Sequence, residues 1–92
     1  MDVQQEDNGK KGKFFVLENG QQEAEMTYTW AGDSRIIIDH TDVGEALKGK
    51  SAGKQMVMQA VAFAREKGIK IIPLCPFAKS VFDKVAEIRD VL

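Results

Sequence analysis

The chain has 92 residues and is short of several residue types: it has one cysteine, one histidine and no long apolar run. Because Cys75 is the only cysteine, no disulfide can form within the chain, which is typical of proteins of the reducing cytoplasm. A structural zinc site uses about four cysteine or histidine ligands, and Cys75 and His40 together are too few. No segment approaches the roughly 20 apolar residues of a membrane helix, and no signal-peptide pattern opens the chain. These absences predict a cytoplasmic protein without a metal site.

The chain also lacks a surplus of charge of either sign. Its 13 basic and 14 acidic residues give a net charge of −1, so we expect neither nucleic acid nor a membrane as a partner. A chain of this length makes one small domain, which buries only about two-thirds of the surface of the unfolded chain. Residues 1–12 are polar and show no apolar periodicity. We therefore expect a disordered or loose tail there and a single domain over residues 13–92.

The first half of the chain has the pattern of three short strands joined by tight turns. The apolar run Lys13–Glu18 stops at Asn19-Gly20, a strong two-residue hairpin signal. Apolar and polar residues then alternate over Glu23–Trp30, which predicts a strand with one dry and one wet face. Arg35–Thr41, with three isoleucines in a row, predicts a third strand.

The spacing of apolar residues becomes helical from Gly53, and Gly68 is placed to end that helix. Ile69–Leu74 predicts a fourth strand, and Phe77–Ala86 a final helix, before an extended tail at Ile88–Leu92. The order β-β-β-α-β-α indicates an α+β fold. We expect a mainly antiparallel mixed sheet with one parallel βαβ pair and a helix on each face.

Gly44–Ser51 matches the P-loop pattern of nucleotide triphosphatases, in which glycine and four residues precede Gly-Lys-Ser. A glycine-containing turn before a helix binds anions, because the first amides of the helix have no partner inside the helix and its dipole is positive at that end. Lys48, Lys50 and Lys54 add positive charge around this turn. The residues thus predict a phosphate cradle, with a solvated loop as the alternative.

The P-loop interpretation meets three obstacles. Ile71–Cys75, the only later strand, ends without an acidic residue to hold Mg²⁺. Glu45–Lys48 favours a helical turn over an open phosphate loop. A helix that starts near Gly49 is interrupted by Ala52-Gly53. A cradle for another phosphate ligand fits better.

Lys48–Gly53 also fits a second frame: arginine or glutamine, two residues, glycine, one residue, and glycine or alanine. Lysine replaces arginine, and Ser51 replaces the central glycine. Ile36–Val43 contains a His-Thr pair at the end of the third strand, and Ile71–Ala78 contains Cys-Pro-Phe after the fourth. In these features the chain from Phe14 to Leu92 resembles the short, single-domain members of the GNAT superfamily of acetyl-CoA-dependent acyltransferases.

The resemblance implies that acetyl-CoA or CoA binds between the diverging ends of two parallel strands. The residues that it implies as cofactor contacts are Thr41, Asp42, Val43, Lys48, Gly49, Lys50, Ser51, Ala52, Gly53 and Lys54. It implies Cys75 and His40 as the catalytic pair. His40 would act as a base, or would lower the pKa of Cys75 so that its thiolate accepts the acyl group. The plainer interpretations are a small buried cysteine and a polar residue at a strand end.

The resemblance implies an acyltransferase whose partners are acyl-CoA and an unknown amine acceptor, acting as a monomer or weak dimer. The alternative is a CoA- or acyl-CoA-binding module with weak or no catalysis. Ser51 favours this alternative, as do Val81 and Phe82, which stand where many larger relatives have a tyrosine acid. A third possibility is an interaction domain without a ligand. Asp39 and Glu25 are interpreted as solvated strand carboxylates.

Overall fold

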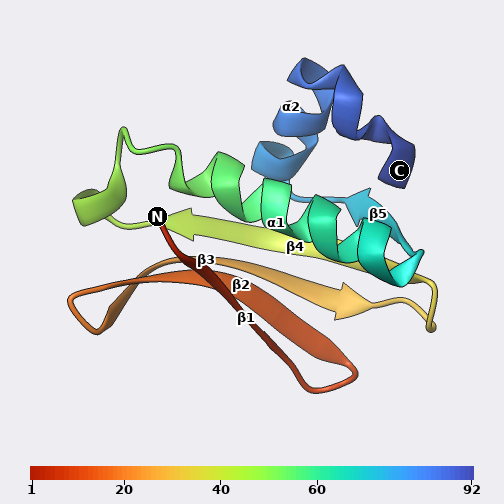
Figure 1. The fold of residues 1–92 in the computed structure, drawn as a ribbon, viewed down its shortest axis with the longest axis horizontal. Coiled ribbons are helices and arrows are strands. Elements are labelled where there is room, and N and C mark those ends of the chain that lie inside the picture. The colour runs from red at the N-terminus through yellow and green to blue at the C-terminus, as the bar shows by residue number, and fades with distance from the viewer.

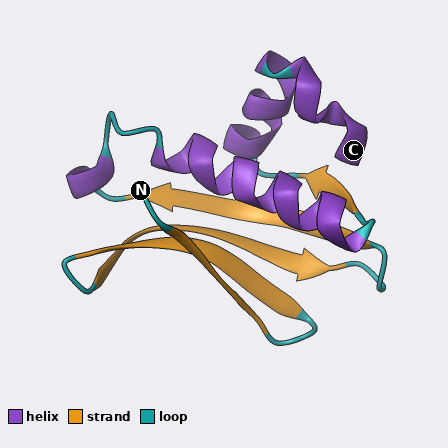
Figure 2. Ribbon diagram, viewed as in Figure 1, coloured by secondary structure: helices purple, strands orange, loops and turns teal.

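A single five-stranded sheet forms the centre of the molecule, in a computed structural model that describes residues 1–92. Neighbouring strands are neighbours in sequence, and all pairs are antiparallel except the last, between Arg35–Val43 and Lys70–Pro73. Figures 1 and 2 show the helices lying along this sheet. The elements are β1 (Val3–Asp7), β2 (Lys11–Glu18), β3 (Gln21–Trp30), β4 (Arg35–Val43), η1 (Glu45–Leu47), α1 (Ala52–Lys67), β5 (Lys70–Pro73), α2 (Pro76–Lys84) and η2 (Ala86–Val91). The predicted fold class is confirmed, with one strand more than expected.

The extra strand is β1, where the sequence predicted part of a loose tail. Val3–Asp7 pairs with β2 along its whole length, so the prediction is wrong for this segment. Side chains hold the strand: Gln5 donates to the Tyr28 hydroxyl (2.8 Å), and Asp7 accepts hydrogen bonds from Tyr28 (2.6 Å) and Trp30 (2.9 Å). The residues in contact are polar and far apart in sequence, so the spacing of apolar residues does not predict this strand.

Both helices lie on the same side of the sheet, where the sequence predicted one on each face. Met26 and Ile38 belong to the sheet face that α1 covers, and both are fully buried. Helix α1 contacts α2 and η2 as well as the strands, and side chains of all these elements join one hydrophobic core. The other face carries Thr27, Thr29 and Asp39, and no helix contributes to it. The apolar side chains of α2 join the same core as those of α1, so α2 packs beside α1 and does not cross to the far face.

Helix α1 follows the predicted pattern. It ends at Gly68, whose φ of 67° is left-handed and whose amide donates to the carbonyl of Ala64. The C-terminal segment differs from the prediction: Ala86–Val91 is a 3₁₀ helix and not an extended tail. Its Ile88 and Val91 side chains are buried in the core, which favours a compact turn over an extended strand. No helix of the structure has both the length and the apolar character needed to span a membrane.

Candidate functional site

Strands β4 and β5 separate at the carboxyl end of their parallel pair. The register ends at Ile38 opposite Pro73, and β4 continues to Val43 with no strand beside it on that side. The amides of Leu74 and Cys75 both donate to the Ile38 carbonyl, at 3.1 and 2.9 Å, and the chain then turns into α2. The end of β4 therefore has one edge to which an extended ligand can bind by strand addition.

A β-bulge interrupts β4 at this point. The register pairs Tyr28 with Ile38 and then Thr27 with His40, so Asp39 is an additional residue in β4. Bulges redirect side chains and are frequent beside active sites. Because of the bulge, both Asp39 and His40 lie on the sheet face that has no helix, as their partners on β3 show.

Thr41 lies on the opposite face of the sheet from His40. It stands across from Met26, a fully buried core residue, so its side chain is on the face that α1 covers. Val43 follows on that face and is half-buried, whereas Asp42 stands opposite Glu25 and is exposed on the open face.

Cys75 caps the N-terminus of α2 and lies on the helix-covered side of the separation between the strands. The residue is 6% exposed, and its Sγ donates a hydrogen bond to the Thr41 Oγ1 at 3.3 Å. Burial raises the pKa of the thiol, but the Thr41 hydroxyl and the backbone amides of Ala78 and Phe77 outweigh burial and lower that pKa below its ordinary value. The site is thus built to stabilise negative charge on this sulfur.

The structure brings Cys75 together with Thr41 and not with His40. The His40 side chain is exposed on the other face of the sheet and makes no hydrogen bond or ion pair. The sequence did not reveal this because it gives no sign of the bulge, which sets the face of each residue beyond Ile38. In this arrangement the His40 side chain does not contact Cys75 and does not lower its pKa directly.

The predicted phosphate cradle leads into the N-terminus of α1. Gly49 (φ +79°) and Ser51 (φ 61°) both have left-handed backbones, and the helix starts at Ala52. The amides of Ser51, Ala52, Gly53 and Lys54 donate to no protein group. Four consecutive free amides at the positive end of a 16-residue helix have the chemistry to bind an anion.

Lysines around the cradle differ in their availability. The Lys48 ammonium is 2.7 Å from the Glu45 carboxylate, an exposed ion pair within the same turn. Lys50 and Lys54 are exposed and make no ion pair, so their charges remain available to an anion at the free amides.

The Phe77 ring packs on Gly53 of the cradle, and Phe77 lies two residues after Cys75. A Cβ atom at Gly53 would lie 2.5 Å from the Phe77 ring, so only glycine allows this approach. Phe77 is 41% exposed, and its ring covers the first turn of α1. One aromatic ring thus joins the start of α1 to the start of α2.

The free strand edge and the free amides suit the two parts of coenzyme A. Its pantetheine amides can pair with an extended edge, and its pyrophosphate matches a helix N-terminus. The cofactor contacts predicted from the sequence lie along these two features, from Thr41 to Lys54.

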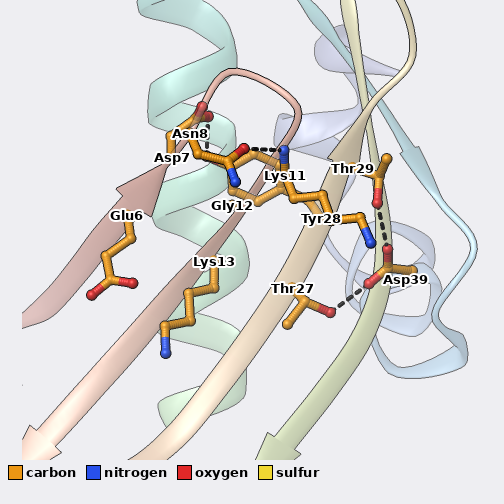
Figure 3. A pocket seen from close by; sticks show the side chains of 10 residues that line it. All are labelled: Glu6, Asp7, Asn8, Lys11, Gly12, Lys13, Thr27, Tyr28, Thr29 and Asp39. Carbon is orange, nitrogen blue, oxygen red and sulfur yellow. Dashed lines mark hydrogen bonds between the residues drawn. The ribbon is translucent and has the colours of Figure 1, made fainter.

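A hollow of about 510 Å³ lies on the open face, close to the separation of β4 and β5 (Figure 3). Asp39 is fixed at its margin: Thr27 Oγ1 and Thr29 Oγ1 both donate to its carboxylate, the second at 3.0 Å. The sequence suggested only a solvated carboxylate here. The alternation of polar residues along β3 was the available signal, because Thr27 and Thr29 share one face.

Comparisons with known proteins agree with this architecture. The sequence model of the GCN5-related N-acetyl-transferase family matches residues 13–91. A GCN5-like protein from Staphylococcus aureus, solved by NMR, is 34% identical, with a TM-score of 0.71 over 98% of this chain and 85% of that chain. A solved aminoglycoside N-acetyltransferase in complex with CoA shares the fold, with 11% identity and a TM-score of 0.65 over 90% of this chain and 88% of that chain.

Among relatives known from sequence, Protein NATD1 of Danio rerio is 28% identical over 76% of this chain. The aligned region is 64% of the length of that protein, so this chain spans somewhat less than two thirds of it. The match of the family model to nearly the whole chain settles the assignment. The chain belongs to the GCN5-related N-acetyltransferase family.

Proposed function

We propose that the chain transfers an acyl group, in the first place acetyl, from acyl-CoA to an amine. The observation that carries the proposal is the separation of β4 from β5 beside four free amides at the start of α1. Family membership supports the same conclusion. The free cysteine fits a reducing cytoplasm, and we expect a monomer or weak dimer.

In this proposal the edge Thr41–Val43 pairs with the pantetheine arm. The amides of Ser51–Lys54 bind the pyrophosphate, with Lys50 and Lys54 adding positive charge and Gly49 allowing the turn. Lys48 contributes less, because Glu45 already neutralises it. The thioester would then lie at the bulge, between the open face and Cys75.

The proposed reaction divides between the two faces of the sheet. The amine nitrogen attacks the thioester carbonyl from the open face, forming the C–N bond, and the C–S bond to CoA breaks. His40 takes the proton that the amine loses, and a backbone amide near Thr41 stabilises the oxyanion. Cys75, whose pKa is lowered, returns a proton to the CoA thiolate from the helix-covered side.

Two observations favour the second candidate, a CoA-binding module with weak or no catalysis. Ser51 holds a left-handed backbone that suits glycine better. Val81 and Phe82 of α2 are buried and have no acidic hydrogen, so α2 supplies no tyrosine acid.

Acetyl-CoA titration followed by mass spectrometry distinguishes these candidates. We expect acetyl-CoA to bind and an amine panel to yield acetylated products, with turnover about 100-fold lower in His40→Ala. An acetyl adduct on Cys75 that disappears in Cys75→Ala would show that the acetyl group passes through Cys75 and is not transferred directly. Binding with neither product nor adduct would favour the binding module, and absence of binding would contradict both.

A further inference from the structure

The proposed acyl transfer gives no role to the hollow on the open face of the sheet. On the other face, α1, α2 and η2 fill the space over the sheet with core side chains. An acceptor must therefore reach the separation of β4 and β5 from the open face. The hollow reaches this point at Asp39, the residue directly after the last β4–β5 pair.

The size and lining of the hollow restrict the acceptor to a small polar molecule. Its volume of about 510 Å³ lies within the range of small-molecule sites, roughly 300–1,000 Å³. Of its lining residues only Tyr28 is hydrophobic, and the Tyr28 hydroxyl donates to Asp7, another residue of the lining. An apolar or bulky amine would leave these polar groups without partners.

Two opposite charges inside the hollow have no ionic partner. Asp39 and Lys11 both line it, and neither takes part in any of the three ion pairs of the structure. Figure 3 shows the Lys11 side chain extending across the hollow toward Asp39. The other charged groups that line the hollow have neighbouring polar or charged groups. Lys13 donates to Gln22 (2.6 Å), and Asp7 accepts from Tyr28 and Trp30. Glu6 of β1 lies opposite Lys13 of β2.

Asp39 is held as a fixed receptor for a cation. The hydroxyls of Thr27 and Thr29 occupy two of the roughly four lone-pair positions of its carboxylate. The remaining positions are open to the hollow, and both threonines lie where β3 is paired with β2 on one side and with β4 on the other. The Lys11 ammonium group, in the same hollow, can bind an anion.

We infer that the acceptor is a small zwitterion, an α-amino acid, whose ammonium group binds Asp39 and whose carboxylate binds Lys11. This inference rests on the proposed acyl transfer. The bound ammonium lies on the same face as His40. His40 takes one proton before the attack, which leaves the lone pair that attacks the thioester carbonyl, and the second proton is lost to solvent as the C–N bond forms. The product is an N-acylated amino acid and free CoA.

The test compares amino acids with their decarboxylated amines. The protein is assayed by mass spectrometry with acetyl-CoA and each of the common L-amino acids, then with the amine that lacks the carboxylate of the best substrate. We expect kcat/KM at least tenfold higher for the amino acid. Lys11→Met should remove this preference by raising KM for the amino acid about tenfold, with little change for the amine. Lys10→Met, on the exposed turn beside it and outside the hollow, is the matched control and should keep the preference.

A binding measurement supplies a readout that does not depend on turnover. Amide signals of Lys11, Thr29 and Asp39 should shift in NMR spectra when L-serine is added, and less when ethanolamine is added. Acetylation of amines with no preference for a carboxylate would overturn the inference and leave acyl transfer intact. Failure of acetyl-CoA itself to bind would instead overturn the proposed function, and the inference with it.

Discussion

At the scale of single residues, the side chains around the separation of the strands have divided roles. The bulge at Asp39 sends His40 to the open face and Thr41 to the helix-covered face. The base that we propose, His40, and the Cys75 sulfur, whose neighbours lower its pKa, thus stand on opposite sides of one strand, and an acyl group between them would be reached from both.

The bond between Thr41 and Cys75 predicts a pH dependence. The folded-state pKa of Cys75 lies below its ordinary value, so its contribution to stability is complete above the unfolded pKa of about 8.5 and is lost as pH falls through the folded pKa. Thr41→Val removes the hydroxyl that accepts a hydrogen bond from the thiol and lowers its pKa by donating to the thiolate once the thiol ionises. We expect the difference in unfolding free energy between Thr41→Val and the unchanged chain to grow as pH rises toward 9, as measured by urea denaturation. A difference that is constant from pH 6 to 9 would show that the hydroxyl does not act on the thiolate.

Ser51 predicts a stabilising substitution. Its φ of 61° costs roughly 1–2 kcal/mol for a residue with a Cβ atom, and its hydroxyl caps nothing. Ser51→Gly should raise the unfolding free energy by about 0.5–1 kcal/mol, since glycine also adds entropy to the unfolded chain. Ser51→Ala keeps the strained backbone and is the control, with little change expected in thermal unfolding. Equal melting temperatures for Ser51→Gly and Ser51→Ala would contradict the assignment of strain.

At the scale of elements, β1 depends on side chains more than on its own pattern. Asp7 accepts hydrogen bonds from the Tyr28 hydroxyl, the Trp30 indole and the Gly9 amide. Burial raises the pKa of Asp7, and these bonds, first that of Tyr28, bring it below the ordinary value. The same contact, after burial itself, raises the pKa of Tyr28.

Asp7→Ala should therefore loosen the β1–β2 hairpin. We expect a loss of about 1 kcal/mol, at the low end for bonds to a charged group because Asp7 is exposed. Because the pKa of Asp7 is lowered on folding, this contribution is present above pH 4 and disappears as pH falls further. Hydrogen exchange of the β1 amides measures the effect, with Asp2→Ala as the control outside the strand. Unchanged protection of β1 in Asp7→Ala would contradict this role.

Elements with a clear apolar period were predictable from the sequence, and elements held by polar contacts were not. The alternation along Glu23–Trp30 and the helical spacing before Gly68 each indicated the correct element. The polar strand β1 gave no such signal, since the hydrogen-bond partners of its side chains lie on β3, far away in sequence. The bulge at Asp39 also has no sequence signature, so the face of His40 could not be derived.

The candidate site was predictable in part for the same reason. The cradle residues from Lys48 to Lys54 follow from a glycine-containing turn before a helix, a local pattern. The contact of Cys75 with Thr41 and that of Phe77 with Gly53 join segments far apart in sequence, and only the packed structure defines them.

At the scale of the whole molecule, one face of the sheet is sealed by helices and the other is open. Acyl-CoA is assigned to the seam between β4 and β5, and the acceptor to the open face. The bulged end of β4 borders both, so in this proposal the two substrates meet there.

The most direct test of this assignment is an NMR titration of the labelled chain with acetyl-CoA. The account predicts that the largest shifts fall on the amides of Thr41–Val43 and Ser51–Lys54. ATP with Mg²⁺ at equal concentration should give much smaller shifts. Stronger shifts of the cradle amides with ATP and Mg²⁺, or acetyl-CoA shifts that leave β4 unaffected, would contradict it.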